Sequence, residues 1–100
     1  MRPLYKAYAC ENDEDGNKIL YPGYPVPGET ETPKNGSRLH VELADGTRLQ
    51  TTVIGTQYLS FDPSAADRLR AKTGFYCAIK VPKEFDAPGV ELGANVYVED

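Results

Sequence analysis

Short runs of alternating apolar and polar residues, separated by glycine and proline, extend along most of the chain. Such alternation predicts β-strands, because successive side chains of a strand point to opposite faces of a sheet. Single strands are expected over residues 4–10, 18–21, 75–81 and 91–98, and a hairpin of two strands within residues 38–61. Six strands in a chain of 100 residues favour a mainly β domain.

The clearest of these elements is the hairpin, which has the sequence ADG at its turn. A two-residue loop would set Val41 opposite Gln50, an apolar side chain beside a polar one on the same face. A three-residue loop over residues 44–46 pairs Val41 with Leu49 instead, so we predict the longer loop with a left-handed Gly46. The expected pairs are Leu39–Thr51, Val41–Leu49 and Leu43–Thr47.

Two other stretches interrupt the strand pattern. Residues 21–36 are rich in proline, which lacks a backbone donor, so this segment is expected to be a loop or a sheet edge rather than central sheet. Residues 63–72 are predicted to form a short α-helix. Asp62 suits its N-cap, Pro63 its first position and Gly74 the left-handed residue beyond its end.

Together these elements predict a single domain over residues 1–100, folded as a small six-stranded antiparallel, Greek-key-like barrel with one short α-helix. The barrel is expected to be closed or nearly closed, since closure removes edge strands that otherwise pair with other chains. The sequence leaves open whether two copies of the chain form a homodimer through an exposed strand edge.

The charge of the chain narrows the choice of partner. Its net charge is −4 and its isoelectric point about 4.9, which disfavours duplex nucleic acid because phosphate binding needs clustered Lys and Arg. A basic protein partner suits this charge better. Neither a signal peptide nor an apolar run of about 20 residues that could span a membrane is evident, so a cytoplasmic location is expected. Cys10 and Cys77 have apolar or aromatic neighbours, as reduced, buried cysteines do.

The acidic segment ENDEDGNK, residues 11–18, could be a metal-binding loop or a turn. An EF-hand loop with Gly16 at its sixth position needs a bidentate glutamate at its twelfth, where Pro22 stands. Asp15 followed by Gly16 between two strands is typical of a hairpin turn instead. One histidine and two separated cysteines do not suit a tetrahedral zinc site either. We therefore expect a turn, with no metal and no cofactor.

The leading functional hypothesis is a non-enzymatic module that binds another protein. Its candidate contact residues are Tyr21 and Tyr24 of the YPGYP segment and Asp13 and Asp15 of the acidic turn. Tyrosines beside prolines are held rigidly and offer a good contact surface. The alternative for both tyrosines is a place in the core beneath the proline-rich segment.

A second hypothesis is contact with RNA through a basic span. The candidate residues are Arg68, Arg70, Lys72, Lys80 and Lys83. Such side chains bind phosphate when they share one face, and they form an ordinary solvated surface when they do not. Asp67 and Glu84 lie among them and dilute the positive charge.

A third hypothesis is a small enzyme that uses carboxylates around His40, the only histidine. His40 is expected on the outward face of a strand, beside Glu42. A catalytic base needs a nucleophile or a reacting proton within hydrogen-bond reach, and the sequence offers none. A solvent-facing strand residue is therefore the preferred interpretation.

Three motifs, in chain order, resemble the C-terminal β-barrel domain of elongation factor Tu and the short stand-alone proteins similar to it. They are the strand, acidic turn and YPGYP of residues 5–25, CAIK of residues 77–80 and ELGANV of residues 91–96. The residues that match are Gly16, Gly23, Tyr24, Pro25, Ala78, Ile79, Lys80, Gly93, Ala94 and Val96. The resemblance implies a β-barrel and a role as an RNA- or tRNA-binding accessory to translation, without GTPase activity. The turn has Asn17 where the family usually has an arginine, and the arginine of the family's GYRP segment is missing, because Pro25 follows Tyr24 directly.

Overall fold

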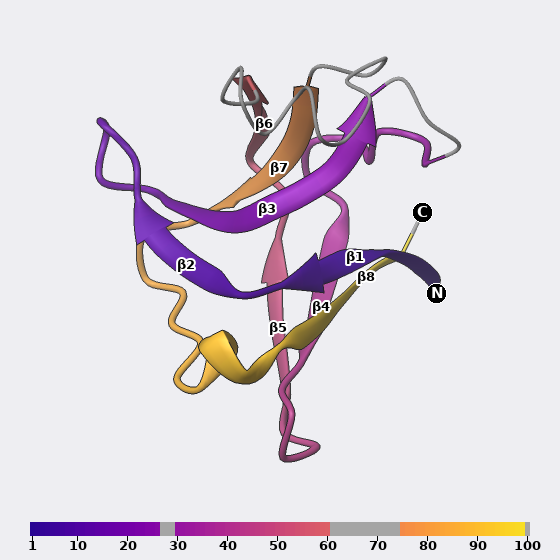
Figure 1. The fold of residues 1–100 in the computed structure, drawn as a ribbon, viewed down its shortest axis with the longest axis vertical. Helices are drawn as coiled ribbons and strands as arrows, with labels where there is room; N and C mark the ends of the chain where they lie inside the picture. The colour runs from indigo at the N-terminus through magenta and orange to yellow at the C-terminus, as the bar shows by residue number, and fades with distance from the viewer. Residues whose placement is uncertain (27–29, 61–74, 100) are drawn as a thin grey trace.

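The chain forms two antiparallel sheets of four strands each in the computed structural model, which describes residues 1–26, 30–60 and 75–99 (Figure 1). The strands are β1 (Arg2–Ala7), β2 (Ala9–Asn12), β3 (Lys18–Val26), β4 (Arg38–Glu42), β5 (Arg48–Thr52), β6 (Gly55–Ser60), β7 (Phe75–Val81) and β8 (Ala94–Glu99). The first sheet has the order β1-β8-β4-β5 and the second the order β2-β3-β7-β6. The mainly β, antiparallel class is confirmed.

The core lies between the two sheets and is built from every second residue of the strands. Along β8, buried Ala94, Val96 and Val98 alternate with more exposed residues, as the sequence predicts. The fully buried aliphatic side chains of this core include Leu20, Leu39, Val41, Ile79, Val81, Val96 and Val98. Two facing apolar layers of this kind remove both sheets from water on one side and hold them together.

The hairpin of β4 and β5 has the register that the sequence predicts. Val41 is paired with Leu49 and Leu39 with Thr51. The Leu43 N–H donates to the Thr47 carbonyl at 2.8 Å, which closes a three-residue loop. Gly46 in this loop has a φ of +94°, in the left-handed region that favours glycine.

The prediction of six strands in a closed barrel is wrong. The first expected strand is divided at Tyr8 into β1 and β2, and the outgoing strand of the hairpin is divided at residues 53–54 into β5 and β6. Each half pairs in a different sheet: β1 with β8, and β2 with β3. Figure 1 shows β1 running into β2 at this corner. The ladders end at these bends, so among the described residues the sheets are two separate layers.

The proline-rich segment also differs in part from its prediction, because residues 21–26 continue β3. Pro25 is paired with Tyr76 of β7, and the bond from Tyr21 to Pro22 is cis. β2 pairs with β3 only as far as Tyr21. Beyond that residue β3 has one neighbour, so a missing N–H on its open side removes no ladder bond. Residues 21–26 therefore form a sheet edge, which is one of the two predicted alternatives, and not a loop.

A register shift lies at the same place, between Leu20 and Tyr24 of β3. There the hydroxyl of Tyr5, from the other sheet, donates to the Leu20 carbonyl at 2.7 Å and accepts from the Ile79 N–H at 3.1 Å. Gly23 follows with a φ of +97°. A side chain of the first sheet thus bridges β3 and β7 of the second sheet at the point where these two strands lose register.

Two further predictions concern helices. The α-helix expected over residues 63–72 lies outside the described residues. The strand expected at 91–98 begins later than predicted. Residues 90–92 form a 3₁₀-helix, η1 (Val90–Leu92), and β8 begins only at Ala94. Gly93 has a φ of +100°, which breaks the extended run between them. No helix in the described part of the chain is long and apolar enough to cross a membrane.

Candidate functional site

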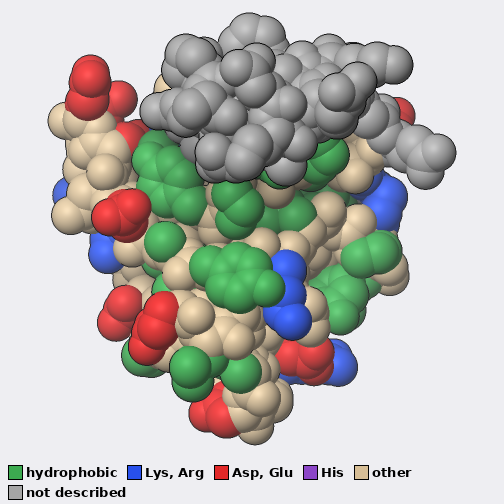
Figure 2. Space-filling model, viewed as in Figure 1, with side chains coloured by type: hydrophobic (Ala, Val, Ile, Leu, Met, Phe, Trp, Pro, Cys, Tyr) green, Lys and Arg blue, Asp and Glu red, His purple; other side chains and the backbone are tan. Residues whose placement is uncertain are grey.

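A groove with a volume of about 540 Å³ lies in the described surface beside the turn between β2 and β3. The groove lies on the face of the second sheet that points away from the core. Its lining residues are Asn12, Asp13, Glu14, Asp15, Ile19, Tyr21, Gln57 and Lys80. Figure 2 shows acidic side chains at this turn next to hydrophobic side chains of the neighbouring strands.

The acidic turn has a well-defined backbone, as the sequence predicts. The Asp13 N–H donates to the Asn17 carbonyl at 2.7 Å, and Gly16 has a φ of +87°. This is the same three-residue loop that the β4–β5 hairpin uses. Asp13 fixes it further, because its Oδ1 accepts from the N–H groups of Asp15 at 2.9 Å and Asn17 at 2.8 Å. Glu14 and Asp15 are thereby held at the exposed tip.

The second carboxylate oxygen of Asp13 reaches across to β7. Its Oδ2 lies 2.9 Å from the Lys80 ammonium, and the Asp13 side chain is only 6% exposed. Oδ2 is buried and makes no well-aligned hydrogen bond, so the contact is an ion pair. The Lys80 ammonium holds the pKa of Asp13 below its ordinary value, and the N–H groups of Asp15 and Asn17 act in the same direction. Asp13 in turn raises the pKa of Lys80.

This pair predicts a pH dependence of stability. A carboxyl group whose pKa is lowered on folding stabilises the protein above the unfolded pKa of about 4, and this contribution is lost as the pH falls through the folded pKa. The difference in free energy of unfolding between the wild type and Asp13→Asn should therefore be largest at neutral pH and shrink below about pH 4. Urea denaturation at a series of pH values measures it.

Glu14→Gln is the matched control for that experiment, because Glu14 is exposed and forms no salt bridge with the described residues. Its effect on stability should be small and nearly independent of pH. If the loss of stability caused by Asp13→Asn stayed constant as the pH falls, the ion pair with Lys80 would not be the source of the stability that Asp13 provides.

The floor of the groove is apolar. Ile19 is 3% exposed and pairs with Lys80, while Ala78 beside them is fully buried. Both residues alternate with core residues of their strands, Leu20 and Ile79, and neither belongs to the core cluster. They therefore point to the outer face, where Tyr21 also lies half-buried. The groove combines an apolar floor, one aromatic wall and an acidic rim.

The structure brings together three of the four residues predicted to contact a partner. Asp13, Asp15 and Tyr21 all line the groove. Tyr24 does not: it is 2% exposed, its ring packs 6.2 Å from that of Tyr5, and its hydroxyl donates to Thr32 Oγ1 at 2.9 Å. Burial raises the pKa of Tyr24 to about 12. A partner has no access to this side chain, so the core alternative applies to Tyr24.

The basic residues proposed for RNA contact are only partly described. Arg68, Arg70 and Lys72 lie outside the described residues. Lys83 is exposed in the loop after β7. Lys80 is paired with Asp13 in a groove that has three carboxylates and one ammonium, a formal charge of −2. Such a groove repels phosphate.

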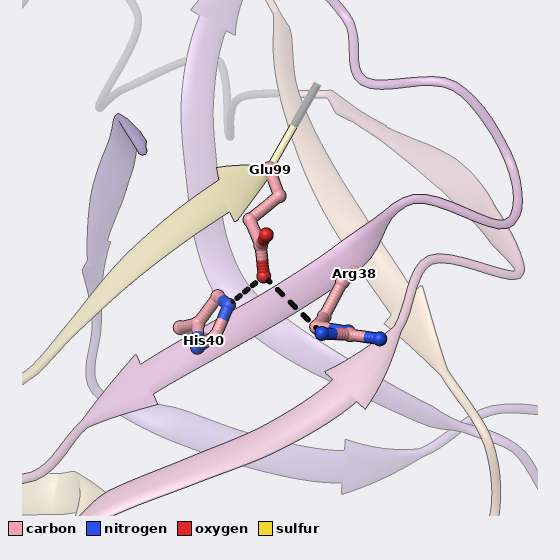
Figure 3. Close-up of polar contacts among 3 residues, drawn as sticks. All are labelled: Arg38, His40 and Glu99. Carbon is pink, nitrogen blue, oxygen red and sulfur yellow. Dashed lines mark hydrogen bonds and ion pairs between the residues drawn. The ribbon is translucent and has the colours of Figure 1, made fainter.

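His40 lies on the outer face of the first sheet, in a cluster with Glu99 and Arg38 (Figure 3). Its Nε2 pairs with Glu99 Oε2, and the Arg38 guanidinium lies 3.9 Å from the same oxygen. His40 thus faces outward, as expected, although contact with Glu99 leaves its side chain only 13% exposed. The carboxylate that it contacts is not Glu42, which pairs with Arg48 at 3.2 Å.

The His40 cluster lowers the pKa of one carboxyl group: His40, and to a lesser extent Arg38, hold the pKa of Glu99 below its ordinary value. A general acid at neutral pH needs a raised carboxyl pKa, so the direction of this shift does not suit Glu99 for that role. The arrangement is typical of a cross-strand ion pair that joins β4 to β8.

The sequence did not identify four of the lining residues, nor Lys80 as a partner of Asp13; the four are Asn12, Glu14, Ile19 and Gln57. Lys80 and Gln57 come from β7 and β6, far from the turn in sequence, and only the pairing of β3 with β7 and of β7 with β6 places them there. Alternation along residues 18–21 does place Ile19 and Tyr21 on one face. No group of three His, Cys, Asp or Glu among the described residues could hold a metal ion.

Comparisons of the chain with protein-family models, with curated proteins and with solved structures give no match. The resemblance to the C-terminal domain of elongation factor Tu therefore stays a prediction from short motifs. A proposal about function depends on the geometry of the groove.

Proposed function

We propose that the protein is a non-enzymatic module that binds a segment of another protein in the groove beside the β2–β3 turn. The observation that supports this most directly is the convergence of Asp13, Asp15 and Tyr21 on one open hollow. The sequence pattern predicts that these three residues contact a partner.

The groove has the physical properties of a peptide-docking surface. It is bounded by β3, β7 and a turn that Asp13 fixes through two backbone hydrogen bonds, so little ordering is needed on binding. Tyr21 offers a large, rigid contact area beside the apolar floor. Binding energy in protein interfaces often concentrates on aromatic side chains of this kind.

Contact with RNA is the alternative proposal. It depends on the basic residues of 68–83 and on the resemblance to a translation-factor domain. The negative groove does not support it, because phosphate would meet Glu14 and Asp15 at the rim. An RNA surface would therefore have to lie elsewhere on the chain.

Selection of short random peptides displayed on phage tests the proposed function. Peptides recovered on the wild type should lose affinity by about tenfold or more for Tyr21→Ala, since truncation of a central tyrosine typically lowers binding by about 2 kcal/mol. Binding is measured by fluorescence anisotropy with synthetic copies of the recovered peptides, and circular dichroism confirms that each variant is folded.

Tyr8→Ala is the matched control. Tyr8 is 51% exposed but does not line the groove. Its truncation should leave the affinity of the recovered peptides unchanged. If Tyr8→Ala weakened binding and Tyr21→Ala did not, the binding surface would lie outside the groove and the proposed function of this site would be wrong.

A further inference from the structure

We infer that the groove accepts an arginine side chain of the partner, with the guanidinium at the Glu14–Asp15 rim and the aliphatic stem over Ile19 and Tyr21. This inference rests on the proposed function and specifies its partner. Three features of the groove support it: the distribution of charge, the apolar floor and the aromatic wall.

The charges of the groove are arranged so that its one cation is already neutralised. Lys80 forms its ion pair with Asp13, at 2.9 Å, on the inner side of the turn. Glu14 and Asp15 are exposed at the tip and form no salt bridge with the part of the chain that the structure describes. Two adjacent carboxylates are thus left to meet an incoming cation.

The apolar floor selects an amphipathic side chain over a small ion. Ile19 points away from the core and is the aliphatic residue that lines the base of the hollow. A metal ion or a simple ammonium would gain nothing from such a base, whereas an arginine or lysine side chain places its methylene groups there and its charge at the rim. The groove is therefore suited to a long basic side chain of a peptide.

Two features favour arginine over lysine. A guanidinium is planar and stacks on an aromatic ring, and Tyr21 provides such a ring in the wall of the groove. Its donors also form a fork that matches the two oxygens of a carboxylate, and two consecutive residues, Glu14 and Asp15, supply carboxylates to the groove. The lysine ammonium is more strongly hydrated, so its transfer into the groove is less favourable.

Titration of the full chain with a short Gly/Ser peptide that has one central arginine tests the inference. The matched probes carry lysine or citrulline, an uncharged analogue of arginine, at the same position. Backbone NMR shifts of Asp15, Gly16 and Asn17 report binding at the turn. The arginine peptide should bind about tenfold or more tightly than the citrulline peptide, and more tightly than the lysine peptide.

The double variant Glu14→Gln, Asp15→Asn should remove this preference for arginine. Its control is Asp86→Asn, Glu91→Gln, which changes the net charge by the same amount at exposed positions outside the groove. The control should bind the arginine peptide as the wild type does. An equal loss in both double variants would mean that only the overall charge of the protein matters, and it would overturn the inference.

The remaining outcomes separate the inference from the proposed function. If citrulline and arginine peptides shifted the turn resonances equally, or if lysine bound as tightly as arginine, the inference would be wrong and the groove would still be a peptide site. If neither these probes nor any peptide from the phage selection bound in a way that depends on Tyr21, both proposals would fail.

Discussion

Replacement of Gly23 by alanine is expected to destabilise the protein by about 3 kcal/mol or more. The φ of Gly23 is +97°, which side-chain-bearing residues rarely adopt. A Cβ at this position would also lie 2.3 Å from the Cys77 carbonyl oxygen and 2.7 Å from the Ala78 nitrogen. Both are backbone atoms of β7, so the clash is relieved only if the two strands separate. Urea denaturation, followed by circular dichroism, measures the loss.

Gly16→Ala is the control that isolates the contact with β7. Gly16 has a similar φ of +87°, but no atom lies within 4 Å of its added Cβ. Its replacement should destabilise the protein by about 1 kcal/mol, which reflects the left-handed backbone alone. Equal losses of stability at the two positions would mean that β3 can move away from β7 with little change in free energy, contrary to the close approach of the two strands in the structure.

The sequence predicts the β4–β5 hairpin down to individual pairs, because the choice there depends on local information. Only one loop length sets Val41 opposite Leu49 rather than opposite Gln50, and the structure has that register. The acidic turn follows the same rule, with Gly16 in the left-handed region after two residues of loop. Where the turn residue and the apolar pattern agree, the register follows from the sequence.

The division of the first expected strand could not be predicted in the same way. Residues 4–10 alternate without interruption, and nothing in that pattern marks Tyr8 as a corner. The break arises because residues on either side of Tyr8 pair with strands that are distant in sequence, β8 and β3. The expected end of the next strand at residue 21 is wrong for a related reason. The two prolines of β3 lie where β2 has ended, so they do not stop the strand, and alternation along β3 does not reveal this.

The candidate site shows the same limit. Asp13, Asp15 and Tyr21 are close in sequence to one turn, so their common location follows from a local prediction. The opposite positions of Tyr21 and Tyr24 also follow from alternation along β3, since residues three apart lie on opposite faces of a strand and Tyr24 shares the core face with Leu20. The ion pair of Asp13 with Lys80 depends on pairing across 67 positions of the chain, which only the fold provides.

Replacement of Tyr5 by phenylalanine is expected to destabilise the protein by about 2 kcal/mol. The Tyr5 hydroxyl bridges the Leu20 carbonyl and the Ile79 N–H at the register shift. Phenylalanine keeps the ring and leaves both backbone groups without this partner in a part of the molecule with little access to water. Burial raises the pKa of Tyr5, so the hydroxyl remains a donor at pH values where an ordinary phenol begins to ionise. Urea denaturation measures the change in free energy of unfolding.

Amide hydrogen exchange gives a second measurement that a general loss of stability does not imitate. The Ile79 N–H should exchange faster in Tyr5→Phe by more than the global change predicts, because it has lost its acceptor. Tyr8→Phe is the control, since Tyr8 is 51% exposed and its change should lie within about 0.5 kcal/mol. If Ile79 kept its protection in Tyr5→Phe, the ladder between β3 and β7 would close without the hydroxyl. Tyr5 would then contribute to the fold only through packing against Tyr24.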